Sequence, residues 1–375
     1  MIKVLHLIDT AKICGPGKTI LESIARYDKS QYQAYLGIFL LKNETENAYC
    51  QAAENREVEV VPIRSSHQLD PRVISETISV IKKMEIDLVL THGYKADIFG
   101  VIAAKMSGLP VISTAHGWIT NNLKSKVYVA LQARALRYAD GVIAVSPSIK
   151  EILLGMKVPE ERIELIYNGI VMENYDPEKA GSAGLRQQFS IDDSAVIVGY
   201  VGRLSPEKGQ KDFITAMSRI VEECPEAHCV LVGDGPSKDD LVAYVSRLGL
   251  EKNIHFTGHL TDVVSVYKEI DVFALTSHTE GFPNVLLEAL CMDVPVLATD
   301  VGGVASIVHP KETGLLVKPG DISGIVDGVV ELIKDKEKAA LYARNGKDMV
   351  CKHYTFNARL NKVQDYYRKI LSGRV

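Results

Sequence analysis

Continuous runs of apolar residues alternate with longer stretches of helical apolar spacing over most of the chain. The runs lack the strict alternation of a strand with one face in water, so each run predicts a strand buried on both faces. Buried strands separated by helices of ordinary length indicate a parallel sheet that helices cover on both sides. The strands predicted in the first half are residues 2–8, 35–40, 58–61, 88–91, 111–113, 142–145 and 162–166.

The pattern stops at residues 168–194, which are polar and rich in turn-forming residues, and then restarts. Such a segment suits a hinge followed by a short lead-in helix. The strands predicted after it are residues 195–201, 229–232, 254–256, 272–275, 295–298 and 314–317. We therefore predict an α/β protein of two Rossmann-like domains, each a doubly wound parallel sheet. Ligands are expected outside the carboxyl ends of the strands, in the cleft across which the two domains face each other.

The chain has 375 residues, 46% of them hydrophobic, and a formal net charge of −4. This length suits two domains, and the charge argues against a general nucleic-acid binder, whose surface needs a basic excess. The first apolar run is broken by His6 and Asp9, and no run is long enough to span a membrane. The six cysteines are scattered without metal-binding spacing, so we expect reduced thiols and a cytoplasmic protein.

The most informative segment is HTEGFPNVLLEAL, residues 278–290, which places Glu280 and Glu288 on either side of a turn that opens a helix. Pro283 lacks an N–H and fits the first turn of that helix. The free N–H groups at a helix start favour a phosphate, whereas carboxylates accept hydrogen bonds from hydroxyls. A phosphate beside sugar hydroxyls describes a nucleotide-sugar.

This E-x7-E segment resembles the signature of the retaining family 4-type glycosyltransferases (glycosyl transferases group 1), which have the GT-B fold. Further motifs of that family recur in order along almost the whole chain. The resemblance implies an N-terminal acceptor-binding domain of residues 1–169 and a C-terminal nucleotide-sugar-binding domain of residues 170–355. In GT-B proteins the last helix crosses back to pack on the first domain, and residues 356–375 have a matching helical spacing. A helix that simply ends the second domain is the alternative.

The family motif G-R-x-x-x-x-K-G matches residues 202–209. It places Arg203 and Lys208 where two cations neutralise a diphosphate as its bond to the sugar breaks. The chain has no D-x-D sequence, so we expect this cation pair in place of a metal. The resemblance assigns Glu280 to a donor-sugar hydroxyl as a catalytic-site residue and Glu288 to the ribose hydroxyls. It implies further donor contacts for Gly202, Gly233, Gly235, His259, Leu260, Gly281, Phe282, Pro283, Asn284, Val285 and Leu286.

In the first domain the resemblance places His116, just after a predicted strand, against the donor sugar as a catalytic-site residue. The glycine-rich segment 12–19 matches the family's loop beside the donor diphosphate, where Gly15 and Gly17 allow close backbone approach. Two departures from the family pattern are Pro16, which separates these glycines, and Asp293, which stands where glycine is usual. Further candidates for acceptor contacts are His92, Trp118 and Lys18.

Three other functions stay open on the same residues. The Gly-Lys-Thr triplet at residues 17–19 suggests a P-loop NTPase, but Lys12 stands where the Walker motif needs its first glycine. A nucleotide-sugar epimerase of the GT-B fold consumes a donor without any acceptor. A non-catalytic nucleotide-sugar-binding protein binds its ligand without turnover.

The resemblance implies transfer of a sugar from a nucleoside-diphosphate sugar to an acceptor hydroxyl with retention, and no separate cofactor. A UDP-sugar is the favoured donor, with GDP- and ADP-sugars open. We expect a glycan or lipid-linked acceptor of cell-surface polysaccharide or glycolipid synthesis. Residues 123–138 carry Lys124, Lys126, Arg134 and Arg137 beside apolar residues. A solvated helix face is the favoured interpretation, and peripheral contact with the inner membrane face is the alternative.

Overall fold

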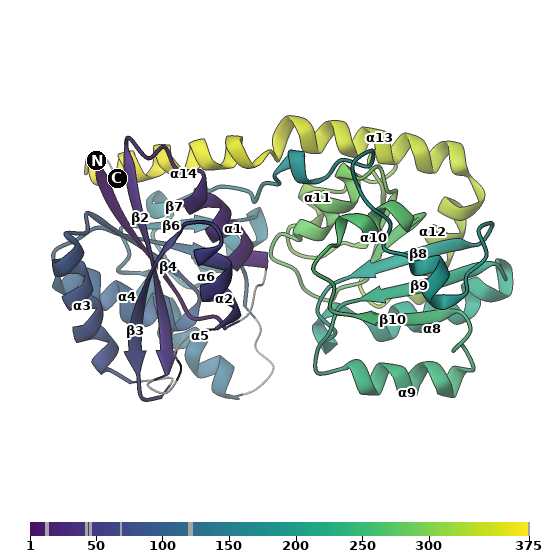
Figure 1. The fold of residues 1–375 in the computed structure, drawn as a ribbon, viewed down its shortest axis with the longest axis horizontal. Helices are drawn as coiled ribbons and strands as arrows, with labels where there is room; N and C mark the ends of the chain where they lie inside the picture. Colours follow the sequence, from purple (N-terminus) through teal and green to yellow (C-terminus); the bar gives the residue numbers. More distant parts are fainter. Residues whose placement is uncertain (12–14, 42–43, 45–46, 68–69, 119–122, 374–375) are drawn as a thin grey trace. The chain divides into compact units, whose positions relative to one another are not determined.

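The computed structural model describes residues 1–11, 15–41, 44, 47–67, 70–118 and 123–373. The chain divides into two compact units, drawn in sequence colours in Figure 1. Unit 1 is Met1–Asn168 together with Leu360–Val375, and unit 2 is Gly169–Arg359. Each unit contains one parallel sheet, so the chain has the two Rossmann-like domains that the strand pattern predicts.

Unit 1 has a seven-stranded sheet in the order β3-β2-β1-β4-β5-β6-β7, and all neighbouring strands are parallel. Strands β4 and β5 are buried along their whole length, which explains why polar and apolar residues do not alternate in them. The strand order reverses between β1 and β4, which is the topological switch point of this sheet. The strands are β1 Ile2–Ile8, β2 Tyr32–Leu41, β3 Glu59–Ser65, β4 Leu88–His92, β5 Val111–Ala115, β6 Gly141–Ala144 and β7 Ile163–Leu165.

Helices cover both faces of the unit 1 sheet. Buried residues of α1, α2 and α14 join those of β1, β2 and β4 in one apolar cluster. On the other face α3, α4 and α5 pack in that order. Helix α4 lies so close to the sheet that a Cβ at Gly100 would come within 2.7 Å of the Thr91 side chain and 2.8 Å of Leu7. The helices are α1 Gly15–Ala25, α2 Ala48–Glu54, α3 Arg72–Met84, α4 Tyr94–Met106, α5 Leu123–Leu136, α6 Pro147–Gly155 and the short η1 Glu160–Arg162.

Helix α14, Phe356–Leu371, begins in unit 2 and packs on unit 1 (Figure 1). The Tyr366 hydroxyl donates to the Arg162 carbonyl at 2.8 Å, and the Tyr367 hydroxyl lies 3.1 Å from that of Tyr27. A Cβ at Gly141 would fall 2.5 Å from the Tyr366 hydroxyl, so a glycine on β6 makes room for this helix. The crossover of the last helix to the first domain is therefore confirmed. The side chains that it adds to the apolar cluster of unit 1 are Leu360, Val363, Tyr366, Tyr367 and Ile370.

Unit 2 has a six-stranded parallel sheet in the order β10-β9-β8-β11-β12-β13, and its order reverses between β8 and β11. The strands are β8 Val196–Val201, β9 Ala227–Val232, β10 Ile254–Gly258, β11 Val272–Leu275, β12 Val296–Thr299 and β13 Leu315–Val317.

Helices α8 and α12 pack together in unit 2, and α11 packs against α13. The starts of α12 and α13 are fixed by the carboxylates of Asp321 and Asp335, which accept from the Gly324 and Lys338 amides at 3.0 Å each. The helices are α7 Leu185–Phe189, α8 Gln210–Glu223, α9 Lys238–Leu248, α10 Val264–Glu269, α11 Asn284–Cys291, α12 Ile322–Lys334 and α13 Lys336–His353. Three short 3-10 turns are η2 Met172–Asn174, η3 Pro206–Lys208 and η4 Val304–Ser306.

Each predicted strand is present, but the predicted ends are approximate. The largest difference is in β3. The apolar run predicts that this strand ends at residue 61, whereas it continues to Ser65. Pro62 and Arg64 interrupt the apolar run, and both are tolerated because β3 is the edge strand of its sheet.

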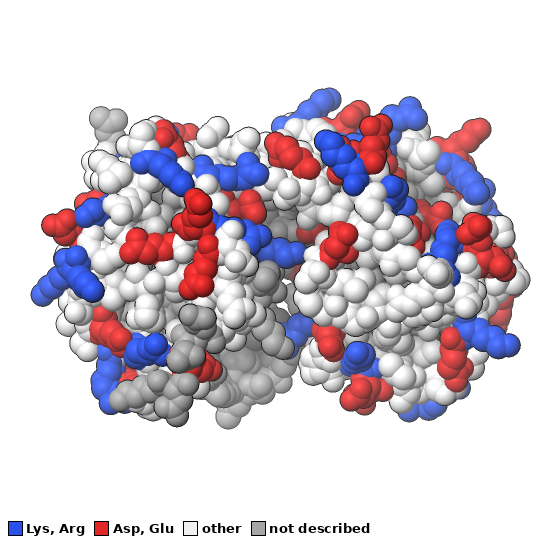
Figure 2. All heavy atoms as spheres, viewed as in Figure 1, with Lys and Arg blue, Asp and Glu red and all other residues white. Residues whose placement is uncertain are grey.

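The surface carries charges of both signs. Lys and Arg are interspersed with Asp and Glu on the face that Figure 2 shows, which agrees with the formal net charge of −4. In the described part of the chain no helix is both long and apolar enough to cross a membrane.

The cysteines of the described residues are free thiols. Cys50, Cys224, Cys229 and Cys291 are buried, and Cys351 is exposed. Burial raises the pKa of Cys291 to about 12, so this thiol is protonated at neutral pH and packs as a small apolar group.

Candidate functional site

The carboxyl ends of β8 and β11 lie side by side at the point where the strand order of unit 2 reverses. Loops that leave such a pair run in opposite directions, and doubly wound proteins bind ligands in the crevice that results. The loop after β8 carries the G-R-x-x-x-x-K-G motif, and the loop after β11 carries the first acid of the E-x7-E motif. The topology therefore brings together Lys208 and Glu280, which are 72 residues apart in the sequence.

Lys208 and Glu280 form a salt bridge in which Nζ lies 2.7 Å from Oε1. The same Oε1 accepts a hydrogen bond from the Ser277 hydroxyl at 2.7 Å. The Glu280 side chain is 8% exposed and that of Lys208 25% exposed. Two donors fix the carboxylate, and its Oε2 accepts from none of the described residues. The pair thus offers an acceptor oxygen and an ammonium with unused N–H groups at one point.

Arg203 lies on the same loop as Lys208, but its side chain is exposed. Its guanidinium has no hydrogen bond or ion pair with a described residue. Its carbonyl accepts from the buried amide Nε2 of Gln210 at 2.7 Å, so the backbone is fixed. A guanidinium on a fixed backbone is suited to bidentate binding of a diphosphate.

Three strand-end loops of unit 2 are joined by backbone hydrogen bonds. The Gly202 amide donates to the Val232 carbonyl at 2.9 Å, and the Gly233 amide donates to the Gly258 carbonyl at 2.8 Å. Gly233 has φ +139, and a Cβ there would lie 1.9 Å from the Gly202 carbonyl oxygen, so the first two loops meet only with glycine at this position. The predicted donor residues Gly202, Gly233, Gly235, His259 and Leu260 therefore lie on adjacent loops, with His259 exposed.

The loop after β12 packs against the backbone of the turn that carries Glu280. Gly302 has φ +56, and a Cβ there would lie 1.7 Å from the Glu280 carbonyl oxygen. Any side chain at this position would displace the Glu280 backbone, so the glycine fixes where the carboxylate lies.

Helix α11 begins at Asn284, and Pro283 is its N-cap residue. Phe282 is buried, with its ring 5.5 Å from that of Tyr354, and it anchors the turn. The Leu286 side chain is fully buried, and its amide donates to the Pro283 carbonyl at 3.2 Å. The half-buried Gly281, Asn284 and Val285 lie at the N-terminal end of the helix.

Glu288 lies one turn inside α11 and is 9% exposed. The Tyr267 hydroxyl of α10 donates to its Oε2 at 3.0 Å. Burial, and then the charge of Glu288, raise the pKa of Tyr267 well above its ordinary value, so this hydroxyl remains a donor. Oε1 of Glu288 accepts from none of the described residues, and it is the atom that can accept from a ligand hydroxyl.

In unit 1 the switch point lies between β1 and β4, where the rings of His6 and His92 stack at a centroid distance of 5.5 Å. The Nε2 of His92 lies 3.2 Å from the Nδ1 of His6, whose Nε2 lies 3.0 Å from the Tyr27 hydroxyl. His116 follows β5, is half-buried and has its ring centroid 6.3 Å from that of His92. The structure therefore brings the predicted residues His92 and His116 to one edge of this sheet.

Trp118 comes two residues after His116 and is half-buried. Its indole Nε1 donates to the Oε1 of Gln132 at 2.6 Å. Gln132 lies on α5 and in turn contacts Asp97 on α4, and both side chains are buried. No sequence motif indicates either residue, so the sequence alone does not predict this contact.

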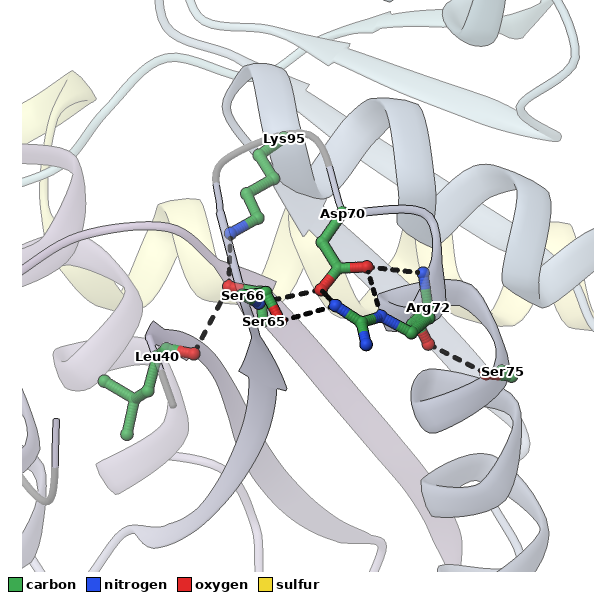
Figure 3. Close-up of polar contacts among 7 residues, drawn as sticks. All are labelled: Leu40, Ser65, Ser66, Asp70, Arg72, Ser75 and Lys95. Atoms are coloured by element: carbon green, nitrogen blue, oxygen red, sulfur yellow. Dashed lines mark hydrogen bonds and ion pairs between the residues drawn. The ribbon is translucent and has the colours of Figure 1, made fainter. Parts of the chain in front are cut away.

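Lys95, in the first turn of α4, is a buried charge at the same edge of the sheet (Figure 3). It is 6% exposed, its Nζ donates to the Ser65 hydroxyl at 3.2 Å, and it lies 4.9 Å from the centroid of the Phe39 ring. Burial lowers the pKa of Lys95, against the charges of Asp9, Asp70 and Glu44, which raise it. One hydrogen bond leaves this ammonium poorly satisfied for its burial.

The carboxylate of Asp70, which lies near Lys95 in Figure 3, is occupied by other donors. It accepts from the Arg72 guanidinium at 2.8 and 2.9 Å and from the Ser66 amide at 2.7 Å. The hydrogen bond from the Arg72 side chain is the main reason that the pKa of Asp70 is lowered. Asp70 therefore joins Ser66 and Arg72 rather than pairing with Lys95.

The glycine-rich segment 12–19 differs from the predicted loop. Helix α1 begins at Gly15, so Gly15, Gly17 and Lys18 lie in its first turn. Gly17 is buried and its carbonyl accepts from the Tyr49 hydroxyl at 2.9 Å, whereas Gly15 and Lys18 are exposed. Pro16 extends the helix because a residue in the first turn needs no N–H donor. Residues 12–14 lie outside the described residues. They include Lys12, which stands where a Walker motif needs its first glycine.

Two family models match the chain in succession. The model for Glycosyltransferase Family 4 matches residues 30–174, and the model for glycosyl transferases group 1 matches residues 183–349. The chain belongs to the group 1, family 4-type glycosyltransferases. The resemblance that the E-x7-E segment suggests is thereby confirmed.

Known glycosyltransferases resemble the chain over most of its length. It is 28% identical to the UDP-Gal:alpha-D-GlcNAc-diphosphoundecaprenol alpha-1,3-galactosyltransferase of Escherichia coli, over 80% of this chain and 79% of that protein. It is 27% identical to the capsular polysaccharide biosynthesis glycosyltransferase CapM of Staphylococcus aureus, over 85% and 86%. A crystal structure of Anabaena HepE in complex with UDP-glucose superposes with a TM-score of 0.87 and 25% identity, over 98% of this chain and 100% of that one.

The predicted residues of this glycosyltransferase fall into two groups, one at the carboxyl edge of each sheet. Unit 2 holds Arg203, Lys208, Glu280 and Glu288, and unit 1 holds His92, His116 and Trp118. No cluster of three or more His, Cys, Asp or Glu side chains within the described ranges is arranged to hold a metal ion. The polar residues that the sequence analysis missed follow strands or lie in helices at these edges. They are Lys95, Asp97, Gln132, Tyr267 and Ser277.

Proposed function

We propose that this glycosyltransferase moves a sugar from a nucleoside-diphosphate sugar to an acceptor hydroxyl with retention at the anomeric carbon. The proposal is carried by the arrangement at the unit 2 switch point. Lys208 pairs with Glu280 at 2.7 Å, and the exposed Arg203 guanidinium lies on the same loop. The two cations are suited to a diphosphate, and the carboxylates of Glu280 and Glu288 are suited to hydroxyls of the sugar and the ribose.

In the proposed reaction the bond between the anomeric carbon and the diphosphate oxygen breaks, and the acceptor oxygen bonds to that carbon from the same face. The leaving diphosphate keeps the electron pair of the broken bond and takes the acceptor proton. Arg203, Lys208 and the start of α11 stabilise the charge that develops on the diphosphate, so no metal is required. Glu280 orients a hydroxyl of the donor sugar, and His116 contacts that sugar.

A UDP-sugar is the favoured donor. The Escherichia coli relative is named for UDP-Gal, and the Anabaena structure contains UDP-glucose. In this assignment Glu288 accepts from the ribose, and its position is kept by Tyr267. The loops of Gly202, Gly233 and His259 supply the remaining contacts to the nucleotide.

We assign the acceptor to unit 1 and propose a lipid-linked or polysaccharide acceptor of the cell surface. Two relatives are named for a diphosphoundecaprenol-linked sugar and for capsular polysaccharide biosynthesis, which supports this class. His92, Trp118 and Lys18 are the proposed acceptor contacts. The protein would act in the cytoplasm, at the inner face of the membrane.

Helix α5 offers a surface for that membrane contact. Val127, Leu131 and Tyr138, at the exposed surface of α5 and just beyond its end, are 52%, 43% and 58% exposed, and the exposed Arg134 lies among them. Apolar and cationic side chains on one helical stripe bind anionic bilayers through burial and charge together. We propose that this stripe rests on the anionic lipid surface.

The donor is tested by thermal shift of the purified protein with UDP, GDP, ADP and ATP, each with and without magnesium. Stabilisation by one nucleoside diphosphate without magnesium supports the transferase and names its donor class. Stabilisation only by a magnesium-bound triphosphate supports the P-loop NTPase and contradicts our proposal. Loss of the donor sugar without any acceptor identifies an epimerase, and ligand binding with no turnover identifies a binding protein.

The membrane contact is tested by sedimentation with vesicles of anionic or zwitterionic lipid. We expect binding to anionic vesicles only, and weaker binding of a Leu131→Glu variant. The control is Leu248→Glu, an exposed leucine of α9 that is 38% exposed in unit 2. Equal sedimentation of the two variants would refute a role for α5.

A further inference from the structure

Four buried polar side chains connect the core of unit 1 to the Trp118 indole. The Trp118 Nε1 donates to the Gln132 Oε1 at 2.6 Å, and the Gln132 Nε2 donates to the Asp97 Oδ2 at 2.5 Å. The Asp97 Oδ1 accepts from the Ser113 hydroxyl at 2.6 Å and from the Thr91 hydroxyl. Asp97 is fully buried and Gln132 is 4% exposed. The chain of hydrogen bonds thus runs from β4 and β5 through α4 and α5 to the segment after β5.

The donors and acceptors allow only one orientation of the Gln132 amide in this chain of hydrogen bonds. The indole N–H can only donate, so Gln132 must turn its carbonyl oxygen toward Trp118. Its NH₂ group then faces Asp97, which accepts it as a carboxylate. Rotating the Gln132 amide by half a turn would put two donors against each other at Trp118. The acceptor oxygen of Asp97 therefore fixes the amide, and the amide fixes the indole.

We propose that Asp97 and Gln132 are positioning residues that hold the Trp118 indole in one orientation at the acceptor edge of unit 1. Trp118 follows His116 by two residues, and its ring is the largest apolar side chain of that segment. A fixed aromatic ring gives a sugar or lipid-linked acceptor a flat apolar surface at a small cost in entropy. The acceptor part of this inference rests on the proposed function, whereas the orientation of the indole does not.

Such a chain is expensive to bury, which argues that it does more than fill the core. A buried carboxylate without a cation costs free energy even when it is hydrogen-bonded. The groups that face Asp97 are two hydroxyls and an amide from β4, β5 and α5, and Lys95 on its own helix donates to Ser65 instead. Burial raises the pKa of Asp97 to about 6, and the three hydrogen bonds oppose that rise. Protonation on Oδ1 would neutralise Asp97 and leave Oδ2 as the acceptor for Gln132, because the Thr91 and Ser113 hydroxyls can rotate to accept.

The orientation is tested without substrate, because Trp118 is the only tryptophan of the chain and its fluorescence reports on one site. In Gln132→Leu the indole loses its acceptor, so we expect a shifted emission maximum and greater quenching by acrylamide. Asp97→Asn is the matched control, since its Oδ1 still accepts from Gln132 while the Thr91 and Ser113 hydroxyls rotate to accept from its Nδ2. Circular dichroism checks the fold of both. Wild-type fluorescence and quenching in Gln132→Leu would overturn the proposal.

The pH dependence gives a second readout. Protonation removes the charge of Asp97 from this chain of hydrogen bonds, and the emission of an indole responds to nearby charge. The wild-type emission is therefore expected to change on acidification with a midpoint near pH 6, and the emission of Asp97→Asn is expected to lack that change. Asp97→Asn keeps His92 and His116, so any effect of those rings on the indole is present in both proteins. An identical titration in the two proteins would refute an effect of the Asp97 charge on the indole.

The kinetic consequence is tested with donor and acceptor present. We expect Gln132→Leu to raise the KM for the acceptor about fivefold, the loss of one hydrogen bond, while the KM for the UDP-sugar is unchanged. In a Trp118→Phe background, which has a ring but no N–H, the same substitution should add nothing. An unchanged acceptor KM beside altered fluorescence would refute the acceptor role alone. Absence of any transferase activity would count against the proposed function and leave the orientation result standing.

Discussion

The ammonium of Lys208 lies 2.7 Å from a carboxylate oxygen of Glu280, so this cation has its counter-ion before any ligand arrives. Arg203, on the same loop, has an exposed guanidinium without an ion pair to a described residue. The two cations of the motif are therefore not equivalent. A diphosphate would be the only anionic partner of Arg203 among the described residues, whereas at Lys208 it would share the ammonium with Glu280. The distinction predicts different phenotypes for the residues of this loop.

Replacing Arg203 with alanine should lower kcat about 10²- to 10³-fold, because a group that stabilises developing charge is lost. The free energy of unfolding should change by less than about 0.5 kcal/mol, since the side chain is exposed. Steady-state kinetics and urea unfolding measure the two effects. Arg219→Ala, whose side chain is also exposed, should keep full activity. Wild-type turnover in Arg203→Ala would remove this residue from the site.

Glu280→Gln and Glu288→Gln should affect different parts of the donor. Glu288 is assigned to the ribose, so Glu288→Gln should weaken binding of UDP itself about tenfold. Glu280 is assigned to the sugar, so Glu280→Gln should leave UDP affinity unchanged and lower turnover of the UDP-sugar. Isothermal calorimetry with UDP separates the two variants. Equal loss of UDP affinity in both would contradict the assignment.

Tyr267→Phe removes the donor that holds Oε2 of Glu288 and keeps the ring in place. We expect a loss of about 1 kcal/mol in the free energy of unfolding and a severalfold weaker binding of UDP. In a Glu288→Gln background the effect on UDP should shrink, because the two side chains act as a unit. Additive losses in the double variant would show that Tyr267 does not work through Glu288.

Lys95→Met should separate stability from function. The ammonium is 6% exposed with one hydrogen bond to Ser65, so replacing it with an apolar chain of similar length should raise the free energy of unfolding by about 1 kcal/mol. If Lys95 contributes to acceptor binding, kcat/KM for the acceptor should fall in the same variant. Lys105→Met, at an exposed lysine that pairs with Asp140, serves as the control. A stabilised variant with unchanged acceptor kinetics would make Lys95 a purely structural residue.

His255 should make unit 2 sensitive to acid. Burial, and then the nearby His228, lower its pKa to about 4, while the unfolded chain takes up a proton near the ordinary value of about 6.5. The unfolded state therefore binds more protons between these values, and stability falls as the pH falls from about 6.5 toward 4. For His255 alone the loss from pH 7 to pH 5 is at most about 2 kcal/mol. His255→Gln should lose less stability over this range than the wild type, with a remainder from His228, whose pKa burial also lowers. Urea unfolding at both pH values measures the difference, and equal losses in the two proteins would contradict the assignment.

Much of the fold could be predicted because buried parallel strands leave continuous apolar runs, and each predicted strand is present. The E-x7-E and G-R-x-x-x-x-K-G motifs could be found because their residues are close in the sequence. Contacts such as Tyr267 with Glu288 or Trp118 with Gln132 could not, because each joins two separate elements. Only the register of the packed helices brings those side chains together.

Asp293 shows how a departure from a family pattern is resolved. This residue stands where the family usually has glycine, and the sequence leaves the shape of the turn open. In the structure Asp293 takes φ +59, the left-handed conformation that aspartate tolerates better than most residues, and its carboxylate pairs with Lys347. The turn therefore keeps the conformation that a glycine would allow.

Helix α14 has a consequence for how the chain is made. The cluster that joins α1 and α2 to the unit 1 sheet is completed by side chains of residues 360–370. At ribosomal rates of about 5–20 residues per second, the roughly 190 residues of unit 2 separate the synthesis of residue 168 from that of residue 360 by about 10–40 s. Unit 1, which is translated first, thus lacks helix α14 until unit 2 has left the ribosome. Its nascent form, with an uncovered apolar face, is the stage at which this enzyme would need a chaperone.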